Sequence, residues 1–276
     1  MSGDATSSTG GTPVAPQTAP QGVPGAKDRP HKKSLLVMIA TERQLLLIVL
    51  IIALVLGMAI LEPDTFPRPA NAAVVLLDTA QTGILACGMM VLMISGMFDL
   101  SIGGILAFSG IMAALTAKYL GFPPVPAFLV GCVWGVFLGA INGVLVTRFK
   151  INALIATLAT LSIYRGGLQL VSGAGVTNIG NDFTVFGQTK LLGIYSPFWF
   201  MVVIVLLFAF LVGRTRYFRQ AYYIGGNARA AKLSGINVDR TVFSFFLIMG
   251  FLSGLAGALL ASRLNTAVVL AGQGVE

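Results

Sequence analysis

Charged residues are scarce in this chain of 276 residues. Lys, Arg, Asp and Glu together make up 10% of it, whereas hydrophobic residues make up 56%. A soluble domain usually carries about a quarter charged residues. The mean hydropathy of +0.87 agrees with this bias. The composition excludes an ordinary soluble domain and predicts an all-α integral membrane protein, a polytopic bundle of helices.

Histidine and cysteine are also rare, and their scarcity excludes several kinds of chemistry. The single histidine, His31, precedes the apolar runs, so an intramembrane Ser-His hydrolase and a histidine proton relay are excluded. Cys87 and Cys132 lie inside apolar runs and are typical of small buried hydrophobic residues, not of a disulfide framework or a metal site. The chain also lacks the Gly-x-x-x-x-Gly-Lys-Ser/Thr loop that holds nucleotide phosphates. We therefore expect no enzyme, no metal and no cofactor in this chain.

Apolar runs dominate the chain after an N-terminal tail. Residues 1–34 are rich in Gly, Pro, Ser and Thr, so we expect a disordered tail there. Residues 35–276 are then expected to form one membrane domain. Seven runs in it are long enough to cross a bilayer or lie at the lower limit of that length. They cover about residues 45–61, 71–96, 101–117, 127–146, 152–171, 197–212 and 242–261.

The distribution of cations predicts how these spans are oriented. Thirteen of the eighteen Lys and Arg residues lie before the first span, at 148–150 or in the polar loop 213–241. Cytoplasmic loops of membrane proteins are enriched in Lys and Arg. We therefore expect the N-terminus and the loop 213–241 in the cytoplasm and the loop 173–195 outside. Because the cations cluster between apolar spans, the net charge of +8 is not a nucleic-acid-binding surface.

Two spans carry residues that a plain lipid-facing helix would not have. Asp78 and Gln81 make the first third of the second span more polar than lipid tolerates, so they should face protein or an aqueous path. In the fourth span glycine recurs at every fourth residue, which puts the glycines on one helix face where another helix can approach closely. These glycines are Gly131, Gly135, Gly139 and Gly143.

Two charged residues lie near the ends of spans. Asp99 precedes the third span, and its plain interpretation is a helix N-cap that accepts hydrogen bonds from free backbone amides. The alternative interpretation is a role at a translocation gate. Arg165 lies near the outer end of the fifth span, where we expect it to reach the external interface or pair with a carboxylate.

The loop 213–241 contains six cations and a short helix signal. Gly225-Gly226 should break the chain, Asn227 should cap a helix that runs to Ser234, and Gly235 suits the left-handed position after it. Two turns of helix need a surface on which to dock. That surface is either the protein's own cytoplasmic face or a partner. For a partner, we expect a small apolar centre flanked by charges. The centre would be Ala230, Ala231 and Leu233, and the flanking charges Arg229 and Lys232.

The run Tyr-Ile-Gly-Gly-Asn-x-x-Ala-Ala-x-Leu-Ser-Gly-Ile-Asn-Val at 223–238 resembles the cytoplasmic signature of bacterial permeases of ABC-type monosaccharide importers, the ribose, xylose and arabinose type. The resemblance implies that this segment is the coupling helix that docks in a groove of the ATPase subunit. The coupling residues it implies are Gly225, Gly226, Asn227, Arg229, Ala230, Ala231, Lys232, Leu233, Ser234 and Gly235.

Further matches to the same family follow along the chain. Asp99-Leu100-Ser101 resembles its Gly-Gly-Ile-Asp-Leu-Ser pattern, with Met97 and Phe98 in place of Gly and Ile, and the stretches 142–148, 151–167 and 254–263 also match. In the family a Gly-x-Gly-x-Glu motif precedes further helices, about ten in all. Because the chain ends within that motif, it resembles a C-terminally truncated permease. The candidates for the translocation path are Asp78, Gln81, Asp99, Ser101 and Asn142.

The resemblance implies a set of partners and a location. The chain would be a subunit of the bacterial inner membrane that works with a second permease copy, a cytoplasmic ATPase that binds the ATP, and a periplasmic sugar-binding protein. The alternative is a secondary transporter driven by protons through Asp78 or Asp99. The loop 213–241 distinguishes the two hypotheses, because a proton-driven carrier has no need of a docking helix.

Overall fold

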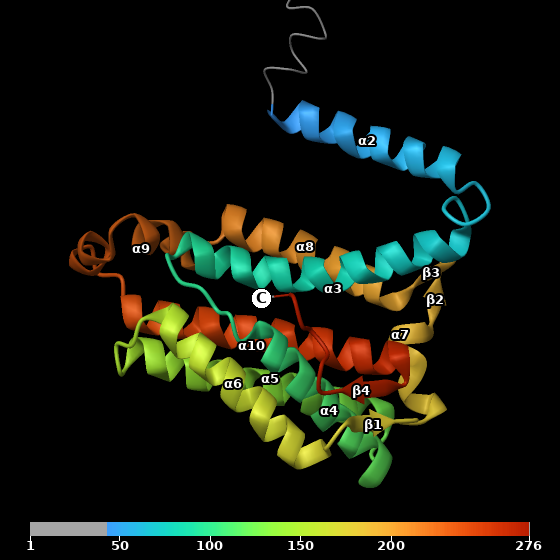
Figure 1. Ribbon diagram of the computed structural model, residues 1–276. Coiled ribbons are helices and arrows are strands. Elements are labelled where there is room, and N and C mark those ends of the chain that lie inside the picture. Colours follow the sequence, from blue (N-terminus) through green and yellow to red (C-terminus); the bar gives the residue numbers. More distant parts are fainter. Residues whose placement is uncertain (1–42, 276) are drawn as a thin grey trace, which may run out of the picture. The chain divides into compact units, whose positions relative to one another are not determined.

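The computed structural model describes residues 43–275 of the chain, and these residues are mostly helical (Figure 1). The helices are α2 (Arg43–Leu61), α3 (Pro69–Ile94), α4 (Ile102–Tyr119), α5 (Pro124–Thr147), α6 (Ala153–Ser172), α7 (Val185–Gln188), α8 (Ser196–Arg214), α9 (Arg216–Leu233) and α10 (Val238–Leu264). The short remaining elements are β1 (Gly175–Thr177), β2 (Lys190–Leu191), β3 (Ile194–Tyr195), β4 (Thr266–Val268) and the 3-10 turn η1 (Asn181–Thr184).

The helices follow the predicted spans closely. Within the described residues, six helices are long and apolar enough to cross a membrane: α3, α4, α5, α6, α8 and α10. The apolar part of α2, Leu45–Leu61, is shorter, at the lower limit for a span. Helix α2 belongs to a structural unit separate from residues 62–276. The tail predicted at 1–34 lies outside the described residues.

Helix α10 forms the centre of the second unit, where it contacts α3, α4 and α5. The glycine stripe predicted in the fourth span is confirmed as the surface that allows this contact. A Cβ atom on Gly135 would overlap the carbonyl of Gly250 in α10, and one on Gly139 would lie 2.5 Å from the carbonyl oxygen of Phe246. Since the backbones themselves are in contact, the two helices can pack this closely only without side chains at these positions.

Helix α4 reaches α10 in the same way. A Cβ atom on Gly257 would overlap the carbonyl of Leu106, and one on Gly110 would lie 2.8 Å from the carbonyl oxygen of Gly257. Cys87 and Cys132 are free thiols, 8% and 5% exposed, and pack with the hydrophobic core as predicted. The core is therefore built from small residues at the helix crossings and larger apolar residues around them.

The two ends of this unit differ. Helix α9 lies at one end, and the strands with α7 lie at the other (Figure 1). Strand β1 pairs antiparallel with β4, and the Lys118 ammonium donates to the Thr177 carbonyl 2.6 Å away. The segment 173–195, predicted only as a loop, is thus partly folded. Strand β1 of this segment pairs with β4 at residues 266–268. Because the two strands are so distant in sequence, no local sequence pattern predicts their pairing.

The connection between α3 and α4 returns into the bundle. Figure 1 shows the chain leaving the α9 end of α3 and running back to α4, which begins partway along the bundle. Gly96 makes the turn possible, because its φ of 78° lies in the left-handed region that favours glycine. The chain after β4 also runs inward, since a Cβ on Gly272 would lie 3.1 Å from Gly103 at the start of α4. Two irregular segments therefore meet the first turn of α4.

Candidate functional site

A fully buried polar cluster holds the α3–α4 connection against α5. The Asp99 carboxylate accepts hydrogen bonds from the Ser101 amide (2.9 Å) and the Ser101 hydroxyl (2.6 Å). The Asn142 amide nitrogen donates to the Ser101 Oγ (2.6 Å) and to the Asp99 Oδ2 (3.3 Å). All three residues are 0% exposed. The structure therefore brings together three of the five residues predicted for the translocation path.

Helix α6 extends this cluster. The Tyr164 hydroxyl donates to the Leu138 carbonyl (2.9 Å) and lies 3.2 Å from the Asn142 Oδ1. The Leu100 amide donates to the Thr157 hydroxyl oxygen (3.1 Å). No role was predicted for Thr157 or Tyr164 from the sequence. The signal that could have found them is the spacing of three and four from Thr157 through Thr160 to Tyr164, which puts polar groups on one face of an apolar helix.

The structure corrects the N-cap interpretation of Asp99. The N-cap of α4 is Ser101, and Asp99 lies two residues earlier. Its side chain accepts from the amide two residues on, which is an Asx-turn, and it also receives the Asn142 amide. The carboxylate thus closes a tight turn inside the bundle and is not the cap of the helix. A role at a translocation gate stays a prediction.

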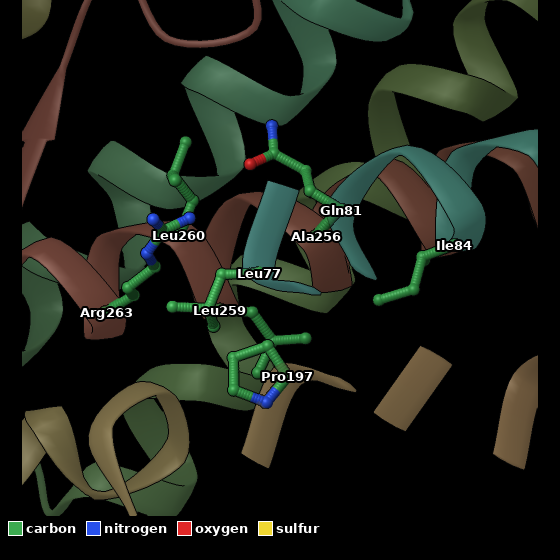
Figure 2. Close-up of a pocket in the computed structure, with 8 residues that line it drawn as sticks. All are labelled: Leu77, Gln81, Ile84, Pro197, Ala256, Leu259, Leu260 and Arg263. Carbon is green, nitrogen blue, oxygen red and sulfur yellow. The ribbon is translucent and has the colours of Figure 1, made fainter. Parts of the chain in front are cut away.

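Asp78 and Gln81 lie apart from this cluster and contact other residues. Asp78 is an exposed residue that pairs with Arg263 at the end of α10, with 3.0 Å between Oδ1 and Nη1. Figure 2 shows Gln81 and Arg263 among the apolar side chains that line a small cavity between α3, α8 and α10. Its volume of about 10 Å³ has room for about one water molecule and not for a sugar. The five candidates therefore form two groups and not one path in this conformation.

Arg165 is held at the strand end of the bundle. Its guanidinium donates to the Val269 carbonyl (3.1 Å), directly after β4. The sequence predicted the external interface or a carboxylate as its destination. This hydrogen bond ties the inward-running segment to α6, and the predicted destination of Arg165 stays a prediction.

Helix α9 differs from the two-turn helix predicted in the loop. It has 18 residues and begins at Arg216, because residues 216–226 are helical as well. The prediction that Gly225-Gly226 breaks the chain is wrong. The interruption lies at Asn227, whose φ of −161° and ψ of 99° are not helical. Asn227 is the predicted cap, since its Oδ1 accepts from the Ala230 amide at 3.0 Å.

The end of α9 is the predicted glycine cap. Gly235 has a φ of 85°, its amide donates to the Lys232 carbonyl, and the next amide, of Ile236, donates to the Ala231 carbonyl. These two bonds form a Schellman motif, which satisfies carbonyls that the helix end leaves free. The second half of α9 is therefore a helix with both ends capped by its own sequence.

The face of this half-helix differs from the predicted apolar centre. Ala231 is 4% exposed and packs with the core of its own chain, so its assignment to a partner-facing centre is wrong. Leu233 is 86% exposed, and Arg229, Ala230 and Lys232 are exposed too. A hollow of about 670 Å³ adjoins Arg229 and Lys232, and another of about 530 Å³ adjoins Ala230 and Ala231. The half-helix thus packs on its own protein through Ala231 and leaves Leu233 exposed, with Arg229 and Lys232 toward one side of it.

Comparison with known proteins decides the family of the chain. The model of the family described as "branched-chain amino acid transport system / permease component" matches residues 71–276. The chain belongs to this permease family. The matched residues include the six long apolar helices of the bundle, apart from the first two residues of α3, together with the polar cluster and α9.

Several curated proteins resemble the permease. It is 40% identical over 228 residues to the ribose import permease protein RbsC of Bacillus subtilis (strain 168), covering 81% of this chain and 70% of the relative. It is 33% identical over 210 residues to the L-arabinose transport system permease protein AraH of Escherichia coli (strain K12), covering 72% and 61%. The D-allose transport system permease protein AlsC of the same organism is 36% identical over 220 residues, covering 78% and 67%.

The permease spans between 61% and 70% of the length of these three relatives. No solved structure matches it significantly.

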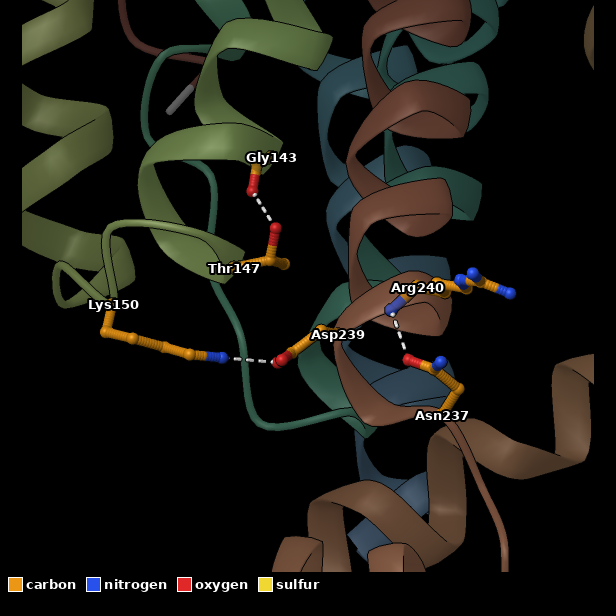
Figure 3. Close-up of polar contacts among 6 residues, drawn as sticks. All are labelled: Gly143, Thr147, Lys150, Asn237, Asp239 and Arg240. Carbon is orange, nitrogen blue, oxygen red and sulfur yellow. Dashed lines mark hydrogen bonds and ion pairs between the residues drawn. The ribbon is translucent and has the colours of Figure 1, made fainter.

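An exposed ion pair joins two turns of the permease at the α9 end (Figure 3). Lys150, after α5, pairs with Asp239 in the first turn of α10, and the Asn237 side chain caps α10 by accepting from the Arg240 amide at 3.1 Å. The Lys150 and Asp239 side chains are 62% and 58% exposed. The pair shows that the turn at 148–150 and the start of α10 lie at the same end of the bundle.

We expect this ion pair to contribute little to stability. Lys150→Gln should lower the free energy of unfolding by less than about 1 kcal/mol, because solvent screens exposed pairs and ordering two long side chains costs entropy. The measurement is thermal unfolding of the purified permease in detergent at low and at high salt. A loss above about 2 kcal/mol, or one that high salt does not reduce, would contradict the expectation.

Proposed function

We propose that this permease is the membrane-spanning subunit of an ATP-driven importer that moves a monosaccharide into the cytoplasm. The names of its relatives support the substrate class, since they are a ribose, an L-arabinose and a D-allose permease. The single feature that carries the proposal is the second half of α9. It is a capped helix at one end of the bundle that exposes an apolar side chain, Leu233, beside two cations.

The partner at this helix is a cytoplasmic ATPase. A centre of apolar contact with a charged rim suits insertion into a groove, because the centre contributes burial and the rim steers the approach. Leu233 supplies the apolar contact, and Arg229 and Lys232 supply the rim. The ATPase binds the ATP, and a second copy of the permease and an extracytoplasmic sugar-binding protein complete the assembly.

The end of the bundle that carries α9 faces the cytoplasm in this proposal. The ion pair between Lys150 and Asp239 groups the cations at 148–150 with those of residues 214–240. Lys118 and Arg263 lie instead at the end where β1 and β4 pair. A membrane protein keeps its Lys-rich and Arg-rich end in the cytoplasm. Because α3 ends at the cytoplasmic end and the predicted span 45–61 precedes it, the N-terminus lies in the cytoplasm as well in this proposal.

The docking helix is tested by Leu233→Asp in the permease co-expressed with its ATPase. A carboxylate at an apolar contact has to be desolvated on docking, so we expect co-purification of the ATPase to fall at least tenfold. The matched control is Leu192→Asp, which changes an equally exposed leucine between β2 and β3 at the other end of the bundle. The control should co-purify the ATPase like the parent.

Two further measurements complete this test. Leu233→Asp should keep the melting temperature of the isolated permease, whereas Ala231→Asp should lower it, because Ala231 is buried in its own chain. Uptake of labelled D-ribose, L-arabinose and D-allose by proteoliposomes, with ATP supplied on the ATPase side and the sugar-binding protein on the opposite side, then tests the substrate class. Unchanged co-purification in Leu233→Asp would contradict the docking helix. Uptake driven by a proton gradient without the ATPase would contradict the importer.

A further inference from the structure

The backbone of α9 touches the backbone of α3 at one point. A Cβ atom on Gly225 would overlap the carbonyl oxygen of Ile94, the last residue of α3, and would lie 3.4 Å from the carbonyl carbon of Ser95. Conversely, a Cβ on Gly96 would lie 3.9 Å from the Gly225 Cα. The nearest atoms on both sides of this contact are backbone atoms. No side chain is therefore available to change rotamer and absorb a displacement of α9.

This contact lies where the α3–α4 connection begins. Ser95 ends α3, is 2% exposed, and donates its hydroxyl to the Leu92 carbonyl at 2.7 Å. After the turn at Gly96 the connection runs into the bundle and ends in the cluster of Asp99, Ser101 and Asn142. The segment 95–101 thus contacts α9 at its beginning and belongs to the buried polar cluster at its end.

The construction of α9 suits it to pass on a movement. Its first half is fixed to the bundle by buried Phe218, Ala221 and Ile224, and Gln220 accepts from the Thr241 hydroxyl at 3.0 Å. Gly225 lies between this anchored half and the interruption at Asn227, after which Ala231 is the buried residue of the second half. A force on the exposed second half therefore acts along α9 on Gly225, in addition to the contact that Ala231 makes with the bundle.

We propose that Gly225 is a positioning residue that couples α9 to the centre of the bundle. It transmits a displacement of α9 to the connection 95–101 and through it to the Asp99, Ser101 and Asn142 cluster at the start of α4. The inference rests on the proposed function, in which the ATPase moves α9, and adds the route inside the permease. Gly225 needs no contact with ATPase or sugar for this role.

The test is Gly225→Ala in the permease, reconstituted in proteoliposomes with its ATPase and the sugar-binding protein. The added methyl group must push α9 away from Ile94, so we expect the ATPase still to co-purify and ATP to be hydrolysed, while sugar uptake per ATP falls at least tenfold. The control is Gly166→Ala on α6, where a Cβ meets nothing within 4 Å. It should keep uptake per ATP within twofold of the parent.

A second measurement does not depend on the variant. Hydrogen–deuterium exchange of residues 95–101 in the parent should change by at least threefold when the ATPase binds ATP, whereas residues 190–195 at the other end should not change. Unaltered exchange at 95–101, or normal uptake per ATP in Gly225→Ala, would overturn the inference while leaving the importer standing. Loss of the ATPase from Gly225→Ala would make Gly225 a docking residue and also overturn it. Failure of the parent to co-purify an ATPase would overturn the proposed function, and the inference with it.

Discussion

Gly135→Leu should destabilise the permease by about 3 kcal/mol or more and remove most of the folded protein from a detergent extract. The side chain would have to occupy space filled by the Gly250 carbonyl and by the Gly254 Cα, which would lie 2.7 Å from the added Cβ. Backbone atoms cannot change rotamer, so α5 and α10 must separate. Because α10 also contacts α3 and α4, the loss extends through the centre of the bundle.

The measurement for Gly135→Leu is the melting curve of the detergent-solubilised permease followed by size-exclusion chromatography. The matched control is Gly213→Leu near the end of α8, where a Cβ meets nothing within 4 Å and leucine favours the helix more than glycine. The control should melt at or slightly above the parent temperature. If Gly135→Leu melted within about 2 °C of the control, α5 and α10 would not pack in the way described.

The second large effect is expected from exchanging the two partners of the buried polar cluster. Asp99→Asn turns an acceptor toward the Asn142 nitrogen into a donor, and Asn142→Asp puts two carboxyl groups next to each other, so each single change should cost about 2–4 kcal/mol. The double change, Asp99→Asn with Asn142→Asp, again pairs a donor with an acceptor. It should recover more than half of the loss.

A double-mutant cycle measures this recovery as a coupling energy. Neighbours in one hydrogen-bond network couple by about 0.5–3 kcal/mol, whereas distant residues add their effects. The parent, both single variants and the double variant are compared by thermal unfolding and by sugar uptake with the ATPase and the sugar-binding protein. If the losses of unfolding free energy in the two single variants added up in the double variant, Asp99 and Asn142 would not be energetically coupled. Recovery of stability without recovery of uptake would show that the position of the carboxylate itself matters for transport.

Much of the local structure could be predicted from the sequence because its causes lie within a few residues. The long helices follow from the apolar runs, and the caps of the second half of α9 follow from Asn227 and Gly235, whose hydrogen bonds span three to five residues. The glycine spacing in α5 predicted a close helix crossing but not the partner. The spacing defines one face of one helix, and only the fold brought Gly250 and Gly254 of α10 against it.

The candidate site depended on contacts between distant residues, which the sequence pattern could not specify. Asp99 and Asn142 are 43 residues apart, and Asp78 and Arg263 are 185 apart, so nothing in the chain predicts that the first two meet while Asp78 pairs elsewhere. The wrong assignment of Ala231 to a partner-facing surface has the same cause, because the residues that bury Ala231 cannot be read from the pattern around it.

By itself the sequence determined that this protein is a bundle of membrane helices with a basic, capped helix at one end. These properties arise from hydropathy, charge and hydrogen bonds between neighbours in the chain. The tertiary structure alone decided that Ala231 faces inward and Leu233 outward, that Gly225 rests on the end of α3, and that Asp99 lies buried beside Asn142. Which face of a helix is covered depends on the elements that pack against it, and those elements are distant in sequence.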